Sequence, residues 1–132
     1  MYSQIKNILL VILMLLLVLF MSSVRAHEMT PTYPEWEPSH VTGVWKTTME
    51  LFNKRKDVDW YEISVFDENW RTIPFVTSYY ILRLKYLDHV KFDIYINKRD
   101  IGRTRYICSK SKLREVNDQK AMVSSRICSK FK

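Results

Sequence analysis

The amino-acid sequence predicts an all-β fold, an antiparallel sandwich of about seven strands that follows an amino-terminal signal segment. Two observations carry this prediction. Apolar and polar residues alternate with a period of two over several runs, and turn-forming or charged residues separate the runs about every 8–12 residues. Beyond residue 26 no stretch keeps a helical period, and a chain with only two glycines disfavours a tightly coiled barrel.

The clearest alternation lies in Phe75–Tyr86 and Val90–Ile96. A period of two places successive side chains on opposite faces of a strand, so each run has one apolar face. Only residues 87–89 separate the two runs. We therefore expect two neighbouring antiparallel strands that cover one core.

Further strands are expected at Val44–Asn53, Asp59–Asp67, Arg103–Ser109 and Ala121–Phe131. In the second of these, the apolar residues at alternate positions are expected to point inward. The run Lys54–Asp57 is interpreted as a charged turn. A polar loop, 110–120, is expected between the last two strands.

Residues 1–26 have the pattern of a secretory signal peptide. Lys6 is the only charge before the unbroken apolar run Ile8–Phe20, and Val24 and Ala26 are the small residues that signal peptidase requires before its cleavage site. A membrane anchor is the alternative, but 13 apolar residues fall short of the ~20 that span a bilayer. We expect cleavage after Ala26, and any membrane contact only through the uncleaved signal segment.

The exported part divides into a proline-rich extended lead-in, 27–42, and one sandwich domain, 43–132. Its charge is uneven, with a net charge of −3 over 27–97 and +8 over 98–132. A basic end is compatible with nucleic acid or an anionic surface, but lysine and arginine at exposed strand positions are the simpler interpretation. We expect no nucleic-acid partner and a periplasmic or secreted location.

Cys108 and Cys128 are the two cysteines of the chain. They lie on the last two expected strands, and a hairpin register that pairs them has its midpoint in the polar loop. An exported protein provides the oxidising environment in which a disulfide persists. A reactive or metal-binding pair would need a CxxC spacing or further ligands, so we expect a structural disulfide.

Val44–Ile96 resembles the amino-terminal immunoglobulin-like domain of PapD-type pilus-assembly chaperones. The resemblance rests on a strand that ends in Asn53, the strand Asp59–Phe66, and Pro74–Thr77 leading into a strand that bends towards Val90–Ile96. It implies an immunoglobulin-like sandwich. In one branch of that family a disulfide links the sixth and seventh strands, at the places that Cys108 and Cys128 occupy.

The resemblance also implies a function, because the seventh strand of those chaperones completes an incomplete pilus subunit by strand addition. In this chain Val123, Ile127 and Phe131 fall on one face of the last expected strand, so we predict that they contact a partner. No match is found for the two basic residues with which those chaperones hold a subunit's carboxylate.

Histidines suggest an alternative of another class, a copper-binding protein. Cleavage after Ala26 leaves His27 with both a free α-amine and an imidazole, a pair that chelates Cu(II) well. A further ligand is then required, and His89, beside Asp88, and His40 are the candidates. Three histidines at unrelated spacings are also what a chain without any metal contains.

The sequence contains no Ser-His-Asp or Cys-His arrangement with independent support and no glycine-rich phosphate loop. Four tryptophans and eight tyrosines are typical of sandwich cores as well as of stacking platforms. The sequence therefore predicts an exported, non-catalytic, protein-binding module, chaperone-like or adhesive, that acts through an edge strand and needs no cofactor. Its expected partner is another exported or envelope protein.

Overall fold

A computed structural model describes residues 1–19, 26–112 and 123–132. One α-helix, nine strands and a 3₁₀-helix occur in these ranges. Their bounds, in chain order, are α1 Tyr2–Leu19, β1 Glu28–Thr30, β2 Glu37–Pro38, β3 Val44–Phe52, β4 Trp60–Asp67, β5 Val76–Thr77, β6 Ile81–Arg83, β7 His89–Asn97, η1 Lys98–Arg103, β8 Thr104–Ser111 and β9 Arg126–Lys130.

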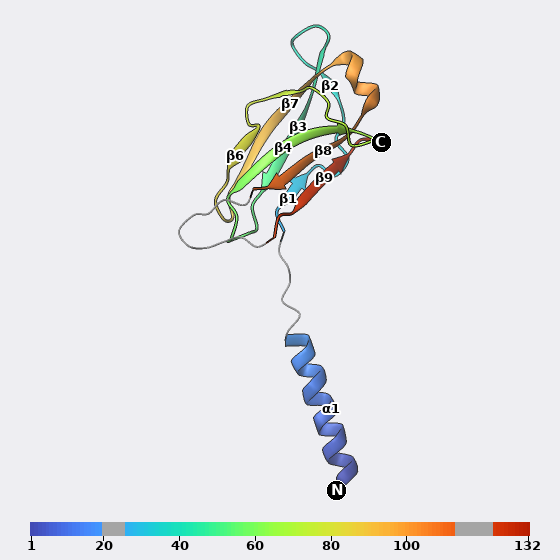
Figure 1. The fold of residues 1–132 in the computed structure, drawn as a ribbon, viewed down its shortest axis with the longest axis vertical. Helices are drawn as coiled ribbons and strands as arrows, with labels where there is room; N and C mark the ends of the chain where they lie inside the picture. Colours follow the sequence, from blue (N-terminus) through green and yellow to red (C-terminus); the bar gives the residue numbers. More distant parts are fainter. Residues whose placement is uncertain (20–25, 113–122) are drawn as a thin grey trace.

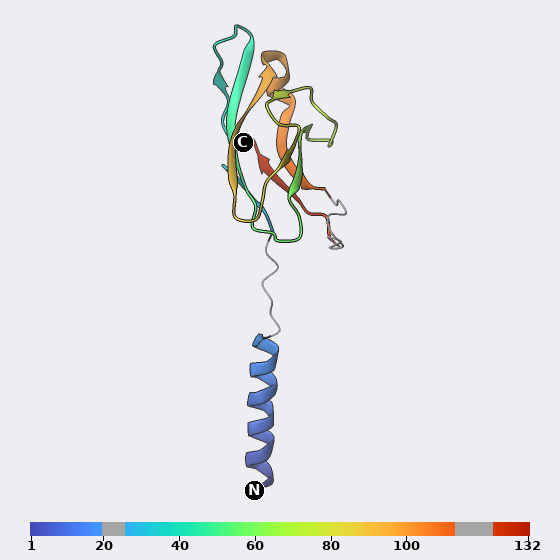
Figure 2. The same ribbon diagram turned by 90° about the vertical axis from the view of Figure 1, so that its left-hand side faces the viewer.

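The strands form two antiparallel sheets that pack face to face, as Figure 2 shows in profile. One sheet has the order β1-β3-β7-β5, and β2 also pairs with β3. The other has the order β6-β4-β8-β9, and Figure 1 displays it from β6 on the left to β9 on the right. Each sheet therefore has two outer strands, and the sandwich has two long edges, one formed by β1 and β9 and one by β5 and β6.

Period-two side chains from both sheets form the core. Tyr61, Ile63 and Val65 of β4 point inward, as the alternation predicts, and Phe92, Ile94 and Ile96 of β7 face them from the other sheet. The buried apolar cluster comprises Met29, Met49, Leu51, Val58, Tyr61, Ile63, Val65, Ile73, Leu82, Leu84, Phe92, Ile94, Ile96, Ile107 and Phe131. The predicted all-β antiparallel sandwich is confirmed.

The predicted pairing of Phe75–Tyr86 with Val90–Ile96 as neighbouring antiparallel strands is confirmed for Val76–Thr77 and wrong for Ile81–Arg83. β5 pairs with β7, but the chain then crosses to the other sheet, where β6 pairs with β4. The crossing is fixed by the amide of Ile63, which donates to the carbonyl of Tyr80 at 2.9 Å. Alternation reports which face of a strand is apolar but not which sheet the strand joins, so a run that changes sheet looks continuous in the sequence.

The lead-in supplies β1 and β2, both of which pair with β3. β9 begins at Arg126, five residues later than the start of the expected strand, and Val123–Ser125 precede it without strand pairing. Most of the expected polar loop, together with Ala121, lies outside the described residues. The boundary at residue 42 remains a prediction.

The predicted signal segment contains α1, which carries the apolar run from Ile8 onward. In the parts of the chain that the structure describes, no helix has the length and apolarity to cross a membrane. Residues 20–25, which include Val24, lie outside the described ranges. Cleavage after Ala26 remains a prediction.

Candidate partner-binding edge

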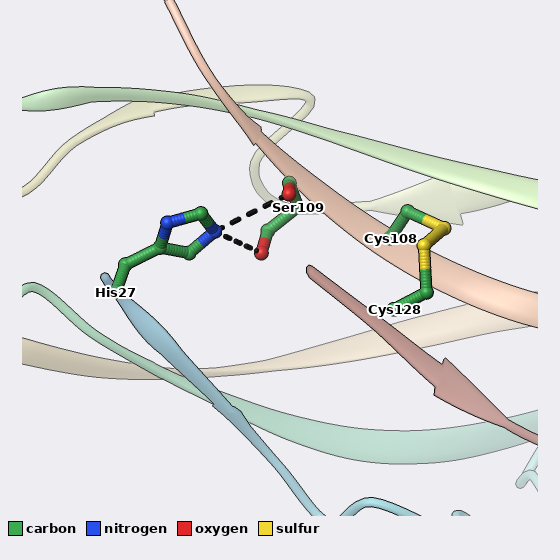
Figure 3. The surroundings of a disulfide bond; sticks show 4 residues. All are labelled: His27, Cys108, Ser109 and Cys128. Atoms are coloured by element: carbon green, nitrogen blue, oxygen red, sulfur yellow. Dashed lines mark hydrogen bonds between the residues drawn. A yellow bond between two sulfur atoms is a disulfide. The ribbon is translucent and has the colours of Figure 1, made fainter. Parts of the chain in front are cut away.

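β9 is an outer strand of its sheet and, among the described residues, pairs with β8 alone. The register places Cys128 opposite Cys108, and a disulfide joins the two with a Cα–Cα distance of 4.1 Å. Both cysteines lie on the outer face of the sheet, because the next residue of β8, Ser109, is buried on the inner face (Figure 3). The bond therefore fixes the register of this hairpin.

The backbone hydrogen bonds of β9 show which of its groups face outward. The amide of Ser111 donates to the carbonyl of Ser125, and the amide of Phe131 donates to that of Arg105, both at 2.9 Å. The N–H and C=O groups of successive residues point to opposite sides of an antiparallel strand. In β9 those of the odd-numbered residues therefore point towards β8, and those of the even-numbered residues point away from it. The amide of Lys130 accordingly donates outward, to the carbonyl of Thr32 at 2.9 Å.

The lead-in thus covers one end of the β9 edge and leaves the rest open. β1 lies beside β9, and Thr32 satisfies Lys130. In the described part of the chain, no strand pairs with Arg126 and Cys128 on their outward side. Unpaired amide and carbonyl groups of this kind accept an additional strand.

The three predicted partner-binding residues lie in different environments. Val123 is exposed and precedes β9. Ile127 is half-buried and packs against the core, and Phe131 is buried and stacks on Trp36 with ring centroids 4.5 Å apart. Ile127 and Phe131 share a face, as the alternation indicates, but that face is directed into the sandwich. Their role in binding a partner remains a prediction.

A polar cluster closes the sandwich beside β9, and its centre is His27. Its Nε2 lies 2.8 Å from the Ser109 hydroxyl and 3.3 Å from the Ser109 carbonyl, contacts that Figure 3 displays. Because a carbonyl only accepts, Nε2 carries the proton, and Nδ1 accepts from the Ser125 hydroxyl at 3.2 Å. A histidine beside a serine resembles a base with its nucleophile, but Ser109 is fully buried and no substrate reaches it.

Arg55 connects this cluster to the loop between β3 and β4. Its guanidinium donates to the hydroxyl groups of Ser111 and Ser125, to the carbonyl of Val123 at 2.9 Å, and to the carboxylate of Asp57. Only 8% of Arg55 is exposed, whereas the side chain of Asp57 is half exposed. One buried cation therefore ties the segment before β9 and the end of β8 to the loop between β3 and β4.

Burial and charge shift the pKa values of this cluster. Burial, with a smaller contribution from the nearby Arg55 charge, lowers the pKa of His27 from 6.5 to about 4. Hydrogen bonding to Asp57 raises the pKa of Arg55, and the same bond lowers the pKa of Asp57. Burial raises the pKa of Tyr61, whose ring packs 4.7 Å from that of His27. The histidine is neutral and the ion pair fully charged at neutral pH.

The structure separates the histidines that were predicted as alternative copper ligands. His27 points between the sheets and packs on Tyr61, whereas His89 is exposed on the outer face beside Phe52. Both ring nitrogens of His27 already have hydrogen-bond partners. Within residues 1–19, 26–112 and 123–132, no three histidine, cysteine, aspartate or glutamate side chains gather into a metal-binding group. Copper binding remains a prediction without a second ligand.

Sequence reasoning missed the Arg55 cluster. The sequence places Arg55 in a charged turn, and a charged turn gives no indication that one of its side chains is buried. The indication of a buried polar cluster lay instead in the serines of β8. Ser109 and Ser111 occupy inward positions of β8, where an apolar residue is expected, and buried hydroxyls at period two indicate a buried polar partner.

Comparison with known proteins supports the fold. No protein-family model and no curated protein matches the sequence. Among solved structures, the chain is similar to the E. coli chaperone DraB, with a TM-score of 0.59 and 17% sequence identity over 80% of this chain. The fold is an immunoglobulin-like sandwich. The chain spans only 53% of the length of DraB, and the predicted resemblance is confirmed as a likeness of fold.

Proposed function

We propose that this chain is an exported, non-catalytic protein-binding domain with a chaperone-like role, which pairs its β9 edge with an extended segment of another exported protein. The observation that carries the proposal is the open outward side of Arg126 and Cys128. The similarity to a chaperone supports a protein as the partner. An adhesive role uses the same edge and differs only in the partner.

The disulfide and the apolar amino-terminal segment support a periplasmic or secreted location. In this proposal the backbone of β9 provides the binding groups. The disulfide and the Arg55 cluster hold that backbone in place. Arg126 and Lys130, exposed on the outer face, favour an acidic partner segment and disfavour a second basic strand.

A proline substitution tests the backbone role directly. Arg126→Pro removes the outward N–H of Arg126 but no bond to β8, because proline is tolerated on the free side of an edge strand. Arg126→Ala is the matched control, since it removes the same side chain and keeps the N–H. A photo-crosslinking residue at position 123 is introduced into both variants, and the exported protein is irradiated in the native envelope.

We expect one crosslinked partner with Arg126→Ala and a loss of that crosslink with Arg126→Pro, while both variants unfold at similar urea concentrations. Equal crosslinking in both variants contradicts the proposal, because a side chain or another surface then makes the contact. Absence of any crosslink in either variant, with the protein folded and exported, also contradicts it.

A further inference from the structure

The long edge opposite β9 contains a second gap in strand pairing. β5 pairs with β7 only at Tyr95 and Ile94. After Thr77 the chain leaves this sheet and crosses to β6 of the other sheet. In the described part of the chain, residues 89–93 of β7 therefore have β3 on one side and no strand on the other.

Flanking hydrogen bonds identify the backbone groups that face this gap. The amide of Asn53 donates to the carbonyl of Asp88 at 3.0 Å, and the amide of Lys98 donates to that of Gly43 at 2.9 Å. Even-numbered residues of β7 thus face β3, and odd-numbered residues face the gap. Tyr95 uses this side to pair with β5, and the backbones of His89, Lys91 and Asp93 continue the same row without a partner strand.

A groove of mixed character lies along the gap. It holds about 490 Å³, and its apolar lining residues are Tyr79, Ile81, Leu82 and Leu84 from the β6 side and Leu87 and Val90 from the β7 side. Arg83, Asp88 and His89 complete the lining. In the described part of the chain after residue 25, nine large apolar residues are exposed, and five of them lie in the short segment 76–87. Exposed apolar residues that gather beside unpaired backbone groups indicate a binding surface.

We propose that this edge, formed by residues 89–93 of β7 and the groove beside β6, binds an extended segment of a partner protein. The segment lies antiparallel to β7, in line with β5, and alternates apolar side chains directed into the groove with acidic side chains directed outward. Five residues of β7 offer about 17 Å of strand. Only an extended backbone meets amide and carbonyl groups that recur at every second residue.

The charge of the outer face favours acidic side chains on the partner segment. His89 and Lys91 both lie against one carboxylate, that of Glu50, at 3.7 and 3.9 Å. Asp93 is already engaged, because its carboxylate accepts from Thr48 and Tyr95. A carboxylate on the neighbouring strand therefore meets the Lys91 cation, whose carboxylate partner Glu50 also contacts His89, whereas a lysine there meets like charge.

A second copy of this chain is a poorer occupant of the gap. Antiparallel self-pairing centred on residue 91 places two Lys91 side chains directly opposite each other, and like charges at opposed positions destabilise a sheet. The proposed edge lies on the opposite side of the sandwich from β9 and presents a different set of exposed apolar residues. The inference about this edge therefore does not depend on the function proposed above.

The test uses the exported protein labelled with ¹⁵N and two capped seven-residue peptides, one alternating valine with glutamate and one alternating valine with lysine. We expect saturable binding of the glutamate peptide and weaker binding of the lysine peptide. At saturation, amide exchange at His89, Lys91 and Asp93 slows at least about tenfold, while the amides of Val90 and Phe92, already bonded to β3, change little.

Ile81→Lys adds a charge to the groove, and Val41→Lys is the matched control, since Ile81 and Val41 are 54% and 49% exposed. Loss of the Ile81 contact weakens peptide binding about tenfold, whereas Val41→Lys leaves it unchanged. Protection at Arg126 and Cys128 instead, no saturable binding of either peptide, or a homodimer in light scattering that Ile81→Lys dissociates would each overturn the proposal. The comparison of amide exchange at odd-numbered and even-numbered residues of β7 uses the unmodified protein, so it tests the proposal even if a variant fails to fold.

Discussion

The two long edges of the sandwich differ in how their outer strands are fixed and covered. At the β1–β9 edge a disulfide, the buried His27 and the Arg55 cluster fix the strands, and Thr32 covers one end of β9. At the β5–β6 edge the chain crosses between sheets and leaves exposed apolar residues along a groove. The first edge is cross-linked and polar, and its backbone stays open at Arg126 and Cys128. The second combines an open stretch of backbone with exposed apolar residues.

The difference indicates how one small domain can hold two dissimilar strand-pairing surfaces. Cross-links and buried hydrogen bonds concentrate stability on the β9 side, so substitutions there are expected to affect folding. On the β6 side few buried contacts depend on the exposed side chains, so substitutions are expected to affect binding and leave folding intact. The four predictions below measure this contrast.

The largest expected effect comes from the disulfide. Cys128→Ser releases a link between residues 20 apart in the sequence, and the extra entropy of the unfolded chain lowers the free energy of unfolding by about 3 kcal/mol. Urea denaturation measures it. Ser129→Ala is the control on the same strand, because the buried Ser129 hydroxyl has no hydrogen-bond partner among the described residues, and its removal is expected to cost nothing. Equal loss in both variants would contradict the prediction.

Acid is expected to weaken the same edge through His27. Its pKa is about 4 in the folded protein against 6.5 as its ordinary value, so between these pH values the unfolded chain binds the proton and the folded chain does not. Stability is therefore complete above pH 6.5 and falls by about 3 kcal/mol as the pH drops to about 4. His27→Gln should lose this part of the pH dependence, and urea titrations from pH 4 to 8 compare the two proteins. Parallel curves would show that His27 does not titrate in this way.

Arg55→Met is expected to destabilise the protein by about 2 kcal/mol, because it leaves the Val123 carbonyl and two serine hydroxyls without their donor. The neighbouring Lys56→Met removes an equal charge from an exposed side chain and should change stability by less than about 0.5 kcal/mol. Thermal unfolding followed by circular dichroism separates the two. Similar losses would mean that Arg55 acts through net charge and not through its buried contacts.

The smallest effect on stability is expected at the open edge. Ile81→Lys should change the free energy of unfolding by less than about 0.5 kcal/mol, because more than half of Ile81 is already exposed. Urea denaturation compares it with the unmodified protein, and Val41→Lys, at a residue of similar exposure, is the control. A loss above 1 kcal/mol would place Ile81 in the folding core and remove the contrast between the edges.

Alternation was sufficient to predict the sandwich and the inward faces of β4 and β7, because buried positions in a strand recur at every second residue. It failed for 75–86, where Leu82 and Leu84 are buried but Val76 and Tyr80 are exposed. The failure has a physical cause. Val76–Thr77 pair in one sheet and Ile81–Arg83 in the other, so the side chains before and after the crossing do not share one inward face. No local pattern records that event.

The polar cluster was unpredictable for a different reason. Arg55, Ser111 and Ser125 are far apart in the sequence, and each is individually typical of a surface residue. Only their convergence in space makes them a buried group. The prediction of Val123, Ile127 and Phe131 as one surface rested on the resemblance and on alternation. Alternation identifies a common face but not whether that face meets solvent or the core.

The burial of His27 bears on the predicted cleavage after Ala26. The predicted site lies between the exposed Ala26 and His27, whose side chain is 2% exposed and is followed directly by β1. A peptidase that binds several residues on both sides of its bond requires an extended, unpaired chain. Under this prediction, removal of the leader would have to precede the docking of β1 on β3. A molecule that folds first would then keep its leader, and the timing of one cut would decide which form of the protein is released.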